Sequence, residues 1–438
     1  MTILYLAEKP SQARDIAEAI GVKKRGNGYI EVTGGKVTWA LGHLLEQAMP
    51  EEYDEKWGGR WSFDTLPMIP AEWKNVVVRS KAEQLKVIKG LLKEAKEVVI
   101  ATDAGREGEL IAREILTHCR YRGPVKRLWT SSLVKADIQK ALKALKPGSA
   151  TEPLHEAALA RQRADWLYGM NGSRAVTLGA HQPGTVYPVG RVQTPTLALV
   201  VRREWEIRNF VPQEYYELEA DVQTASGHRF LMHHVPPESQ RIRDRAEAER
   251  RKRRAEGATG PLKVERSSEK ESPPLPYTLP ALQKDANKVL GLSARDTLRL
   301  AQELYEAKAI TYPRTDCPYL ASSQKAEVEP TLKRLEDVFP GAVQALRKAG
   351  VTLRASTFDD SKLTDHHGIV PTVEPVVISR AAERLFALIC ERYLRTLAPD
   401  CLFDRTIVTL DANGVFFRAT GKQITNPGFR AVRIVSEK

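Results

Sequence analysis

Tyr312 is the residue whose surroundings best suit a nucleophile. It lies in the segment ITYPRTD at residues 310–316, one residue before Pro313 and two before Arg314. Residues i and i+2 of an extended segment point the same way, so the phenol and the guanidinium can face one target. Pro313 lacks a backbone donor and favours a strand end or a loop. The phenol could attack a phosphodiester whose oxygens the arginine holds, although a core tyrosine beside a solvated arginine is also compatible with this segment.

Carboxylates follow two apolar runs in the first part of the chain. One run ends just before Glu8 and the other just before Asp103, and Glu107 opens the helix expected after the second run. Such runs predict parallel strands that feed helices, and functional residues gather at the carboxyl ends of these strands. Three or four carboxylates gathered there, Glu109 among them, would repel one another, so we expect a hard cation such as Mg2+. Lys9 could neutralise a phosphate, and an acidic helix start that satisfies the macrodipole is the alternative.

The elements that position these residues follow from the hydrophobic periodicity of the chain. His43 follows a third apolar run, where it either borders the site or caps a strand. Alternation over residues 216–222 predicts a half-buried strand, and the Asn413-Gly414 pair predicts a hairpin that joins the same sheet. Helices are expected at residues 12–20, 107–119, 279–290, 294–308 and from 381 to about 397, and residues 151–206 are expected to be mostly helical.

A glycine turn before a helix could bind a DNA phosphate. The segment VGRVQTPTL at residues 189–197 opens a helix, whose first backbone amides suit a phosphate. A plain turn that starts a helix is compatible with the same residues. The DNA contacts expected here and on the preceding helical stretch are Arg161, Arg174, Gly190, Arg191, Gln193 and Thr194.

The composition indicates a soluble multidomain protein with a polyanionic partner. The 438 residues are 42% apolar and 28% charged, which suits about three packed domains. The net charge is +12, and basic residues that meet phosphates release counterions, although a basic surface can also serve membranes or solubility. The four cysteines form no CxxC pair, so we expect a reducing cytoplasm. No stretch has the apolar length of a signal peptide or a bilayer span.

The motifs, in their order along the chain, resemble those of type IA DNA topoisomerases, and in particular the bacterial topoisomerase III branch. Residues 8–11 and 103–109 resemble a Toprim domain, and the resemblance covers essentially the whole chain. It implies an α/β and α+β multidomain fold, with a Toprim parallel-sheet domain plus helical and β domains arranged as a toroid. The later motifs are GHL at 42–44, ADWLYG at 164–169, GRVQTP at 190–195, ITYPRTD at 310–316 and DHHGIVPT at 365–372.

The resemblance and the shifts in composition divide the chain into six segments. A basic run at residues 250–254 is expected to be a solvated helix or a mobile loop rather than a dedicated DNA contact. The segments are 1–150 (Toprim domain, domain I), 151–210 (helical DNA-groove domain, first part of domain IV), 211–275 (β-rich arch, first part of domain II, with a basic loop at 236–274), 276–372 (helical catalytic-tyrosine domain, domain III), 373–422 (second part of domain II) and 423–438 (truncated start of the returning domain IV).

The same resemblance assigns roles to the residues around the tyrosine. Tyr312 would attack a backbone phosphate and form a 5′-phosphotyrosyl link, while Arg314 and Lys9 stabilise the charge and Glu8 protonates the leaving 3′-oxygen. A phenol has a pKa near 10 and needs such help. His366 could polarise the phosphate or move a proton. Zinc binding by the histidine pair lacks partners at metal-ligand spacing.

One residue departs from the Toprim pattern Asp-x-Asp-x-x-x-Glu. Gly105 stands where the second aspartate is usual, so Glu8, Asp103 and Glu107 remain the expected ligands of Mg2+. Glu109 could compensate, although its place on the helix turns it in another direction.

These features together predict an ATP-independent topoisomerase that relaxes or decatenates DNA, since the chain has no GxxxxGK[ST] motif. The expected partner is single-stranded, negatively supercoiled or catenated DNA in the cytoplasm, at the nucleoid or on plasmids. A monomer is expected, with no membrane and with a helicase as a further candidate partner. Two rivals remain: a Toprim nuclease or primase that uses metal without a covalent tyrosine, and a non-catalytic relative that only binds single-stranded DNA.

Overall fold

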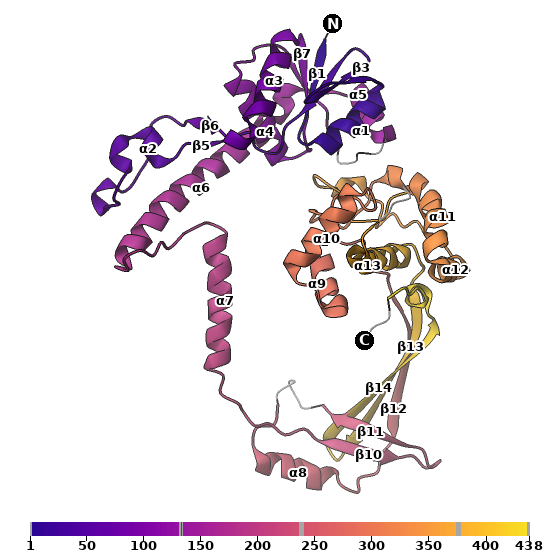
Figure 1. Cartoon of the computed structure of the whole chain (residues 1–438). Helices are drawn as coiled ribbons and strands as arrows, with labels where there is room; N and C mark the ends of the chain where they lie inside the picture. The colour runs from indigo at the N-terminus through magenta and orange to yellow at the C-terminus, as the bar shows by residue number, and fades with distance from the viewer. Residues whose placement is uncertain (1, 131–132, 134, 236–240, 374–377, 436–438) are drawn as a thin grey trace. The chain divides into compact units, whose positions relative to one another are not determined.

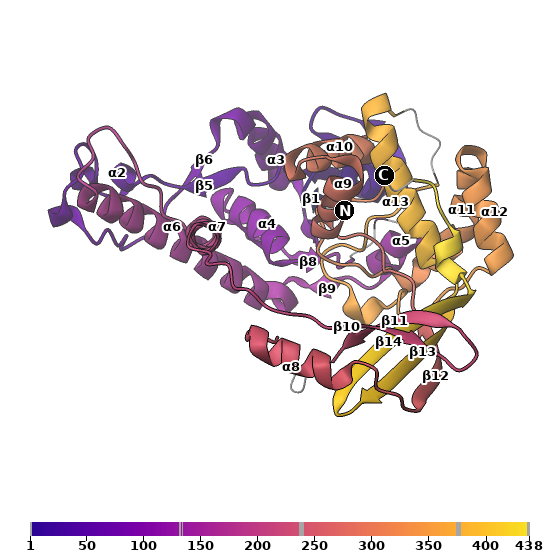
Figure 2. The same cartoon turned by 90° about the horizontal axis from the view of Figure 1, so that it is seen from below.

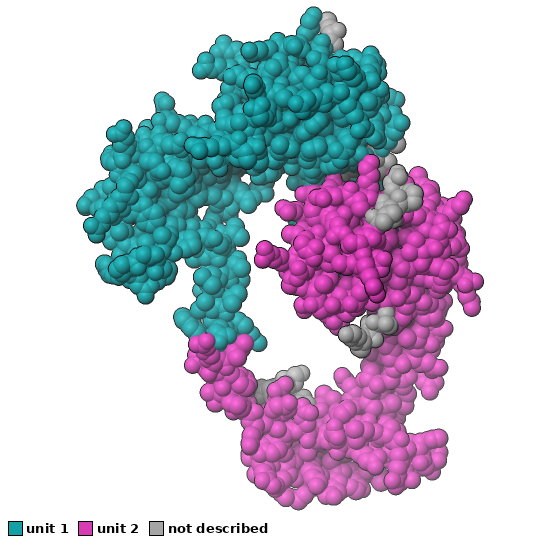
Figure 3. Space-filling view, in the orientation of Figure 1, with its two compact units in different colours: residues 1–205, 315–325, 359–368 teal, residues 206–314, 326–358, 369–438 magenta. Residues whose placement is uncertain are grey.

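The structure is a computed structural model that describes residues 2–130, 133, 135–235, 241–373 and 378–435. The chain forms two compact units (Figure 3). The first unit comprises residues 1–205, 315–325 and 359–368, and the second comprises residues 206–314, 326–358 and 369–438. The chain therefore crosses between the units several times.

The first unit contains a seven-stranded sheet with a parallel centre. The strand order is β2-β3-β4-β1-β7-β8-β9, in which β4, β1, β7 and β8 are parallel and the outer pairings are antiparallel. This confirms the predicted parallel sheet. The strands are β1 (Ile3–Ala7), β2 (Val22–Arg25), β3 (Tyr29–Val32), β4 (Gly35–Trp39), β7 (Glu97–Ala101), β8 (Val125–Arg127) and β9 (Lys146–Pro147), and β5 (Leu45–Gln47) pairs separately with β6 (Asn75–Val77).

Helices cover both faces of this sheet, which explains the continuous apolar runs (Figure 1). Leu4 and Leu6 of β1 point to the core shared with α3 (Ala82–Glu94) and α4 (Arg106–His118). Tyr5 and Ala7, which alternate with them, point to the core shared with α1 (Pro10–Ile20) and α5 (Lys135–Lys143). Because both faces are buried, the site at the strand ends is held from both sides of the sheet.

The predicted helical stretch at 151–206 forms two helices with a break between them. They are α6 (Glu152–Gly179) and α7 (Gln193–Arg208), and α6 packs against α4. A cluster of Trp57, Met68 and Trp166 attaches the middle of α6 to the segment that carries the short α2 (Pro50–Tyr53).

The second unit contains a five-stranded antiparallel sheet in the order β10-β11-β14-β13-β12 (Figure 2). Asn413 and Gly414 both have positive φ values, 56° and 80°, as the two central residues of a type I′ turn require. The predicted hairpin and its return to the first strands are therefore confirmed. The strands are β10 (Glu219–Gln223), β11 (Arg229–His234), β12 (Leu262–Glu271), β13 (Cys401–Ala412) and β14 (Val415–Asn426).

The predicted basic loop at 236–274 is wrong for most of its length. It contains α8 (Arg245–Ala255) and β12, while residues 236–240 lie outside the described residues. Side chains of α8 pair along the helix, with Arg245 to Glu249 at 3.0 Å and Arg251 to Glu247 at 2.7 Å. Such pairs stabilise a solvated helix, which was one of the two forms expected for the basic run.

Five helices complete the second unit, and α9 and α10 pack against α13. The Ser293 hydroxyl accepts the N–H of Asp296 at 3.0 Å and so caps the start of α10. No helix in the described ranges is long and apolar enough to cross a bilayer. The helices are α9 (Leu279–Leu290), α10 (Ala294–Glu306), α11 (Val328–Val338), α12 (Pro340–Ala349) and α13 (Arg380–Thr396).

The division of the chain into six domain segments stays a prediction. Residues 374–377, at the start of the segment expected at 373–422, and residues 436–438, at the end of the last one, lie outside the described residues.

Candidate active site

Glu8 and Asp103 lie together at the carboxyl edge of the parallel sheet. The strands β1 and β7 are in register up to Ala7 and Ala101, so the residues that follow them leave the sheet side by side. The backbone N–H of Asp103 donates to Oε2 of Glu8 at 3.2 Å. Pro10 starts α1 immediately after Lys9, because proline suits the first position of a helix. The turn between β1 and α1 thus carries both charged side chains.

Asp103 is the most heavily bonded carboxylate of this edge. Its Oδ2 lies 3.1 Å from Nζ of Lys9 and 3.3 Å from Nε2 of His366, and Nε2 of Gln12 donates to its Oδ1 at 2.8 Å. Burial by itself would raise the pKa of Asp103, but the hydrogen bond from His366 and the charge of Lys9 outweigh it and lower the pKa to about 2. Asp103 is therefore ionised at every physiological pH.

Glu8 has the opposite tendency, although it is the neighbouring carboxylate. Burial and the negative charge of Asp103 raise the pKa of Glu8 to about 7, against the opposing charge of Lys9. Its own N–H donates to Oε1 of Gln12 at 2.8 Å, which ties the backbone of this turn to α1. Glu8 can therefore hold or release a proton near neutral pH, as a general acid or base requires.

Glu107 is separated from these two carboxylates by its bond to a histidine. Its Oε1 lies 2.6 Å from Nε2 of His43, and Nδ1 of the same ring lies 3.3 Å from Oε2 of Glu114. Hydrogen bonds to both carboxylates raise the pKa of His43 to about 9. His43 thus borders the site as a cation. Within the described ranges, no three histidine, cysteine or acidic side chains converge as a formed metal site.

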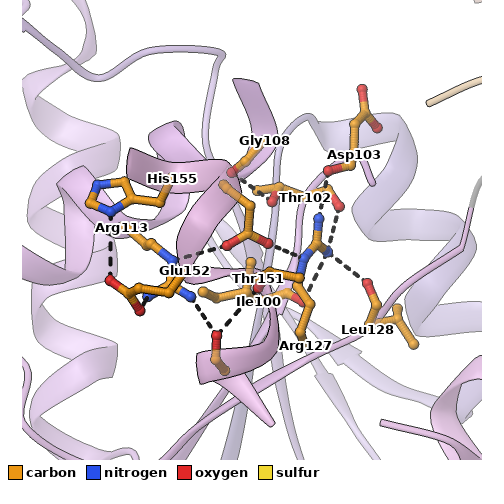
Figure 4. A network of polar contacts seen from close by, with 12 residues as sticks. Ile100, Thr102, Asp103, Gly108, Arg113, Arg127, Leu128, Thr151, Glu152 and His155 are labelled. Carbon is orange, nitrogen blue, oxygen red and sulfur yellow. Dashed lines mark hydrogen bonds and ion pairs between the residues drawn. The ribbon is translucent and has the colours of Figure 1, made fainter. Parts of the chain in front are cut away.

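Glu109 cannot replace the missing second aspartate, because it is fully buried on the other side of α4. Figure 4 shows the polar network to which Arg113, Arg127 and Glu152 belong. The carboxylate of Glu109 accepts from the Arg127 guanidinium and, at 2.9 Å, from Nε of Arg113, which also binds Glu152 at 2.6 Å. The prediction that Glu109 could compensate for Gly105 is therefore wrong, since both oxygens of Glu109 already accept hydrogen bonds from arginines.

Arg127 is a buried residue that the sequence did not single out. Its guanidinium donates to the backbone carbonyls of Thr102 at 2.8 Å, Asp103 at 2.6 Å and Leu128 at 2.6 Å. The bonds to Thr102 and Asp103 satisfy the carbonyls that follow β7, where the chain turns toward α4. The sequence carries no signal that distinguishes a buried arginine in such a short basic segment from an arginine exposed to solvent.

The two adjacent histidines have different surroundings. His366 bonds Asp103, as described, and belongs with residues 359–368 to the first unit. The ring of His367 lies 3.4 Å from Nε2 of Gln324 and 2.9 Å from the carbonyl of Gly368, and burial lowers its pKa. His367 is therefore a neutral structural side chain.

Tyr312 lies in an extended segment of the second unit. The N–H of Thr311 donates to the carbonyl of Val370 at 3.0 Å, and the N–H of Val370 donates back to the Thr311 hydroxyl at 3.0 Å. The half-buried ring of Tyr312 packs edge-on against Tyr305 of α10, with centroids 5.3 Å apart. Arg314 is exposed, and the intervening Pro313 is buried. The structure thus places Tyr312 and Arg314 on one unit and Glu8, Lys9 and Asp103 on the other.

Four of the expected DNA-binding residues lie together where the chain enters α7: Gly190, Arg191, Gln193 and Thr194. The N–H of Gly190 donates to the Thr194 hydroxyl at 3.0 Å, and Gln193 begins α7. The Arg191 guanidinium binds Asp165 of α6 through two contacts of 2.6 and 3.3 Å, and Arg161 lies 3.8 Å from the same carboxylate. Both arginines are exposed, so this turn presents two cations to solvent.

Arg174 does not belong to that surface. Its side chain is buried, donates to the carbonyl of Trp57 at 2.7 Å and stacks over the ring of Trp61. The prediction that Arg174 contacts DNA is therefore wrong. The segment around Trp57 covers this part of α6, and the periodicity of α6 in the sequence did not indicate that it would be covered.

Comparisons with known proteins cover nearly the whole chain. A family model described as "Toprim domain" matches residues 3–133, and one described as "DNA topoisomerase" matches residues 149–438. The chain is 40% identical to DNA topoisomerase 3 of Shouchella clausii over 97% of this chain and 59% of that protein. It is 38% identical to DNA topoisomerase 3 of Bacillus subtilis over 99% of this chain and 60% of that protein. The chain thus spans about three-fifths of the length of these curated relatives.

A solved structure shares the fold. Full-length topoisomerase I from Thermotoga maritima matches with a TM-score of 0.63 and 21% identity, over 99% of this chain and 68% of that one.

Proposed function

Since this chain belongs to the type IA DNA topoisomerase family, we propose that it cleaves single-stranded DNA through a covalent tyrosine link, passes a strand and religates the break. Its substrates would be negatively supercoiled or catenated DNA. The reaction needs no ATP, because the energy of the broken phosphodiester is kept in the phosphotyrosine bond.

In the proposed step, the phenol oxygen of Tyr312 attacks a backbone phosphorus and the bond from phosphorus to the 3′-oxygen breaks. The phenol releases its proton to solvent, and Glu8 gives a proton to the departing 3′-oxygen. The products are a 5′-phosphotyrosyl link and a free 3′-hydroxyl, and religation runs the same step backwards. Arg314, Lys9 and His366 would stabilise the charge on the phosphate oxygens.

The observation that carries this proposal is the cluster at the carboxyl edge of the sheet. Glu8 touches the backbone of Asp103, while Lys9 and His366 both touch the Asp103 carboxylate. Asp103 thereby holds a lysine ammonium group and an imidazole beside a carboxyl whose pKa is raised to about 7. A site for phosphate cleavage needs such an acid next to fixed positive charge.

We further propose that this edge binds Mg2+. Carboxylate oxygens are the donors that Mg2+ prefers, and Mg2+ commonly keeps several waters and needs only one or two protein carboxylates. Asp103 would hold the ion, Glu8 would join in its ionised form, before or after it acts as the acid, and Glu107 would join after its bond to His43 opens. When bound, the cation would neutralise charge on the DNA backbone at this edge.

The turn between α6 and α7 is proposed to hold the single strand. Arg161, Arg191, Gln193 and the amide end of α7 near Gly190 and Thr194 would contact phosphates. The protein is proposed to act as a monomer on cytoplasmic DNA, at the nucleoid or on plasmids, with a helicase as a candidate partner.

A covalent-adduct assay tests the function. The chain is mixed with a 3′-labelled single-stranded oligonucleotide, whose labelled fragment would carry the 5′-phosphotyrosyl link, and the mixture is separated on a denaturing gel. We expect a protein-linked band that Tyr312→Phe abolishes. The matched control Tyr305→Phe removes the phenol hydroxyl of the neighbouring ring and should keep the band.

Other outcomes of this assay would contradict the proposal. Free cleaved product that survives Tyr312→Phe would indicate a metal-dependent nuclease. Retarded native complexes without any cleavage would indicate a protein that only binds single-stranded DNA.

A further inference from the structure

Gly105 stands at a position where the backbone does not require glycine. It precedes α4 with φ −154° and ψ 179°, an extended conformation that any residue adopts. Aspartate would even be favoured there, because its side chain caps the first amides of a helix. The absence of a side chain at this position therefore needs a reason other than backbone geometry.

The reason lies in a different part of the chain. A Cβ atom at position 105 would lie 2.2 Å from Oδ2 of Asp365 and 2.4 Å from its Cγ and Oδ1. The carboxyl group of Asp365 thus fills the space in which a side chain at position 105 would begin. Asp365 belongs to residues 359–368, which are part of the same compact unit as residue 105.

Asp365 is also placed next to the proposed metal edge. The following residue, His366, bonds the Asp103 carboxylate at 3.3 Å. Asp103 already has contacts to Lys9, Gln12 and His366, whereas Asp365 is exposed and makes no hydrogen bond with another described residue. Part of this residue therefore remains open to solvent, although burial also raises the pKa of its carboxyl.

We infer that Asp365 supplies, from a distant part of the sequence, the carboxylate that the Asp-x-Asp pattern would carry at position 105, and that it is a ligand of the divalent cation. This inference rests on the proposed Mg2+ site. It accounts for Gly105 and Asp365 together: the glycine makes room for the carboxylate, and the carboxylate restores the missing negative charge. Carboxylate oxygens from Asp103 and Asp365 with retained waters meet the needs of Mg2+.

The alternative is that Asp365 only faces the positive N-terminal end of α4, as a carboxylate from outside the helix. That role would contribute to stability but not to cation binding, so a binding measurement separates the two.

Mn2+ serves as the probe, because its paramagnetic signal reports binding to the full chain without any assay of activity. We expect saturable Mn2+ binding by the wild type, and a dissociation constant raised about tenfold in Asp365→Asn through loss of one charged ligand. Asp360→Asn is the matched control. It removes a carboxylate from the same segment, and its amide oxygen can still accept the N–H of Ser322. The control should bind Mn2+ as the wild type does.

A swap of the two positions gives the sharper test. In Gly105→Asp with Asp365→Gly, the carboxylate returns to the position of the family pattern and the clash is removed, so Mn2+ binding should return close to the wild-type value. Circular dichroism confirms that each variant is folded.

Each result decides the matter. Unchanged Mn2+ binding in Asp365→Asn, with or without a lower melting temperature, would overturn the inference and leave the covalent-adduct proposal intact. A swap that folds but does not restore binding would overturn the inference that Asp365 replaces a carboxylate at position 105. A wild type without saturable Mn2+ binding would overturn both this inference and the Mg2+ proposal, while the Tyr312 adduct assay would still judge the cleavage reaction.

Discussion

At the scale of single residues, the site separates two neighbouring carboxylates by their surroundings. Asp103 is ionised because Lys9 and His366 touch its carboxylate directly. Glu8 shares the burial and the edge of the sheet, but the charge of Asp103 opposes its ionisation. Pairs of titratable groups whose pKa values are driven apart are typical of acid and base assignments in enzymes.

The raised pKa of Glu8 predicts a pH dependence of DNA cleavage. In the proposed cleavage step the protonated form of Glu8 is the active one, so the single-turnover cleavage rate should fall as the pH rises through about 7. The effect on stability has the same sign. Because the pKa of Glu8 is raised in the folded protein, its contribution to the free energy of unfolding is complete below the ordinary value of 4.5. That contribution is lost as the pH rises through about 7. Rates of oligonucleotide cleavage between pH 5.5 and 8.5 measure the effect.

Glu8→Gln is the control for this pH profile. It keeps the shape of the side chain but cannot donate a proton, so cleavage should slow by about 10²–10⁴-fold and lose its decline near pH 7. A wild-type profile that the substitution leaves unchanged would contradict the role of Glu8 as the acid.

The buried pair of Arg127 and Glu109 predicts a large loss of stability on substitution. Both side chains are inaccessible to solvent. Arg127→Met would leave the Glu109 carboxylate with only Arg113, and loss of one partner of a buried pair costs about 3–5 kcal/mol of unfolding free energy. Urea unfolding, monitored by fluorescence, measures this cost.

Lys36→Met is the matched control. Lys36 pairs with Glu94 at 2.9 Å, but the Glu94 side chain is 65% exposed, so the loss should be at most about 1 kcal/mol. An equally small loss in Arg127→Met would show that Arg127 does not hold the turn after β7.

At the scale of elements, α6 and α7 differ in how firmly the protein holds them. The α6 helix is attached through Trp166, whose indole N–H donates to the carbonyl of Ala48 at 2.9 Å, and through Asn171, which bonds the backbone of Met68. The described residues of α7, in contrast, include no buried side chain. The proposed DNA turn therefore joins a fixed helix to an exposed one.

This turn predicts opposite effects for the two partners of one ion pair. Arg191→Gln should weaken binding of a single-stranded oligonucleotide and reduce its salt dependence, by about 0.7 in the slope of log K against log salt, because one phosphate contact is lost. Asp165→Asn should strengthen binding, since it frees the Arg191 guanidinium from its carboxylate partner. Fluorescence anisotropy at several salt concentrations measures both. Equal affinities for the two variants would contradict a DNA contact at this turn.

At the scale of the whole molecule, charge and connectivity are the main features. The net charge of +12 favours a polyanion. The chain also returns to the first unit twice after leaving it, at residues 315–325 and 359–368. The second return carries His366 and Asp365, and the first begins immediately after Arg314. Only a short stretch of chain therefore separates Tyr312 from residues that belong to the same unit as the Toprim sheet.

The net charge predicts that binding of single-stranded DNA depends strongly on salt. The association constant should fall steadily from 50 to 200 mM salt, with a slope of about −0.7 for each phosphate neutralised. An uncharged peptide nucleic acid of the same base sequence should bind far more weakly and show little salt dependence. Similar affinity for both oligomers would mean that base contacts rather than phosphates dominate.

Much of the fold could be predicted from local pattern. The helices at α9, α10 and α13, the hairpin at Asn413-Gly414 and the parallel strands before Glu8 and Asp103 follow from periodicity and turn chemistry, which involve residues near in sequence. The secondary structure of the basic segment at 236–274 was harder to predict. A run of charged residues indicates that a segment is solvated, but it does not distinguish an exposed helix from a loop.

The site was predictable only in part. Glu8, Asp103 and Lys9 follow from strand ends, since parallel strands bring these ends to one edge. Which side chain pairs with which did not follow, because Glu107 turns to His43 from 64 residues away. The burial of Arg174 under the segment around Trp57 was equally hidden, because that cover comes from 117 residues away.

The sequence by itself determined which segments form strands and helices, that Tyr312 stands in an extended stretch before Arg314, and that carboxylates end two neighbouring strands. Those features depend on neighbours within a few residues. Only the tertiary structure decided that Asp365 fills the space beside Gly105, that Arg127 and Arg113 occupy Glu109, and that Lys9 and His366 hold Asp103. The physical reason is that periodicity states which face of an element is buried, whereas the partner of a buried charge is set by packing between segments far apart in the chain.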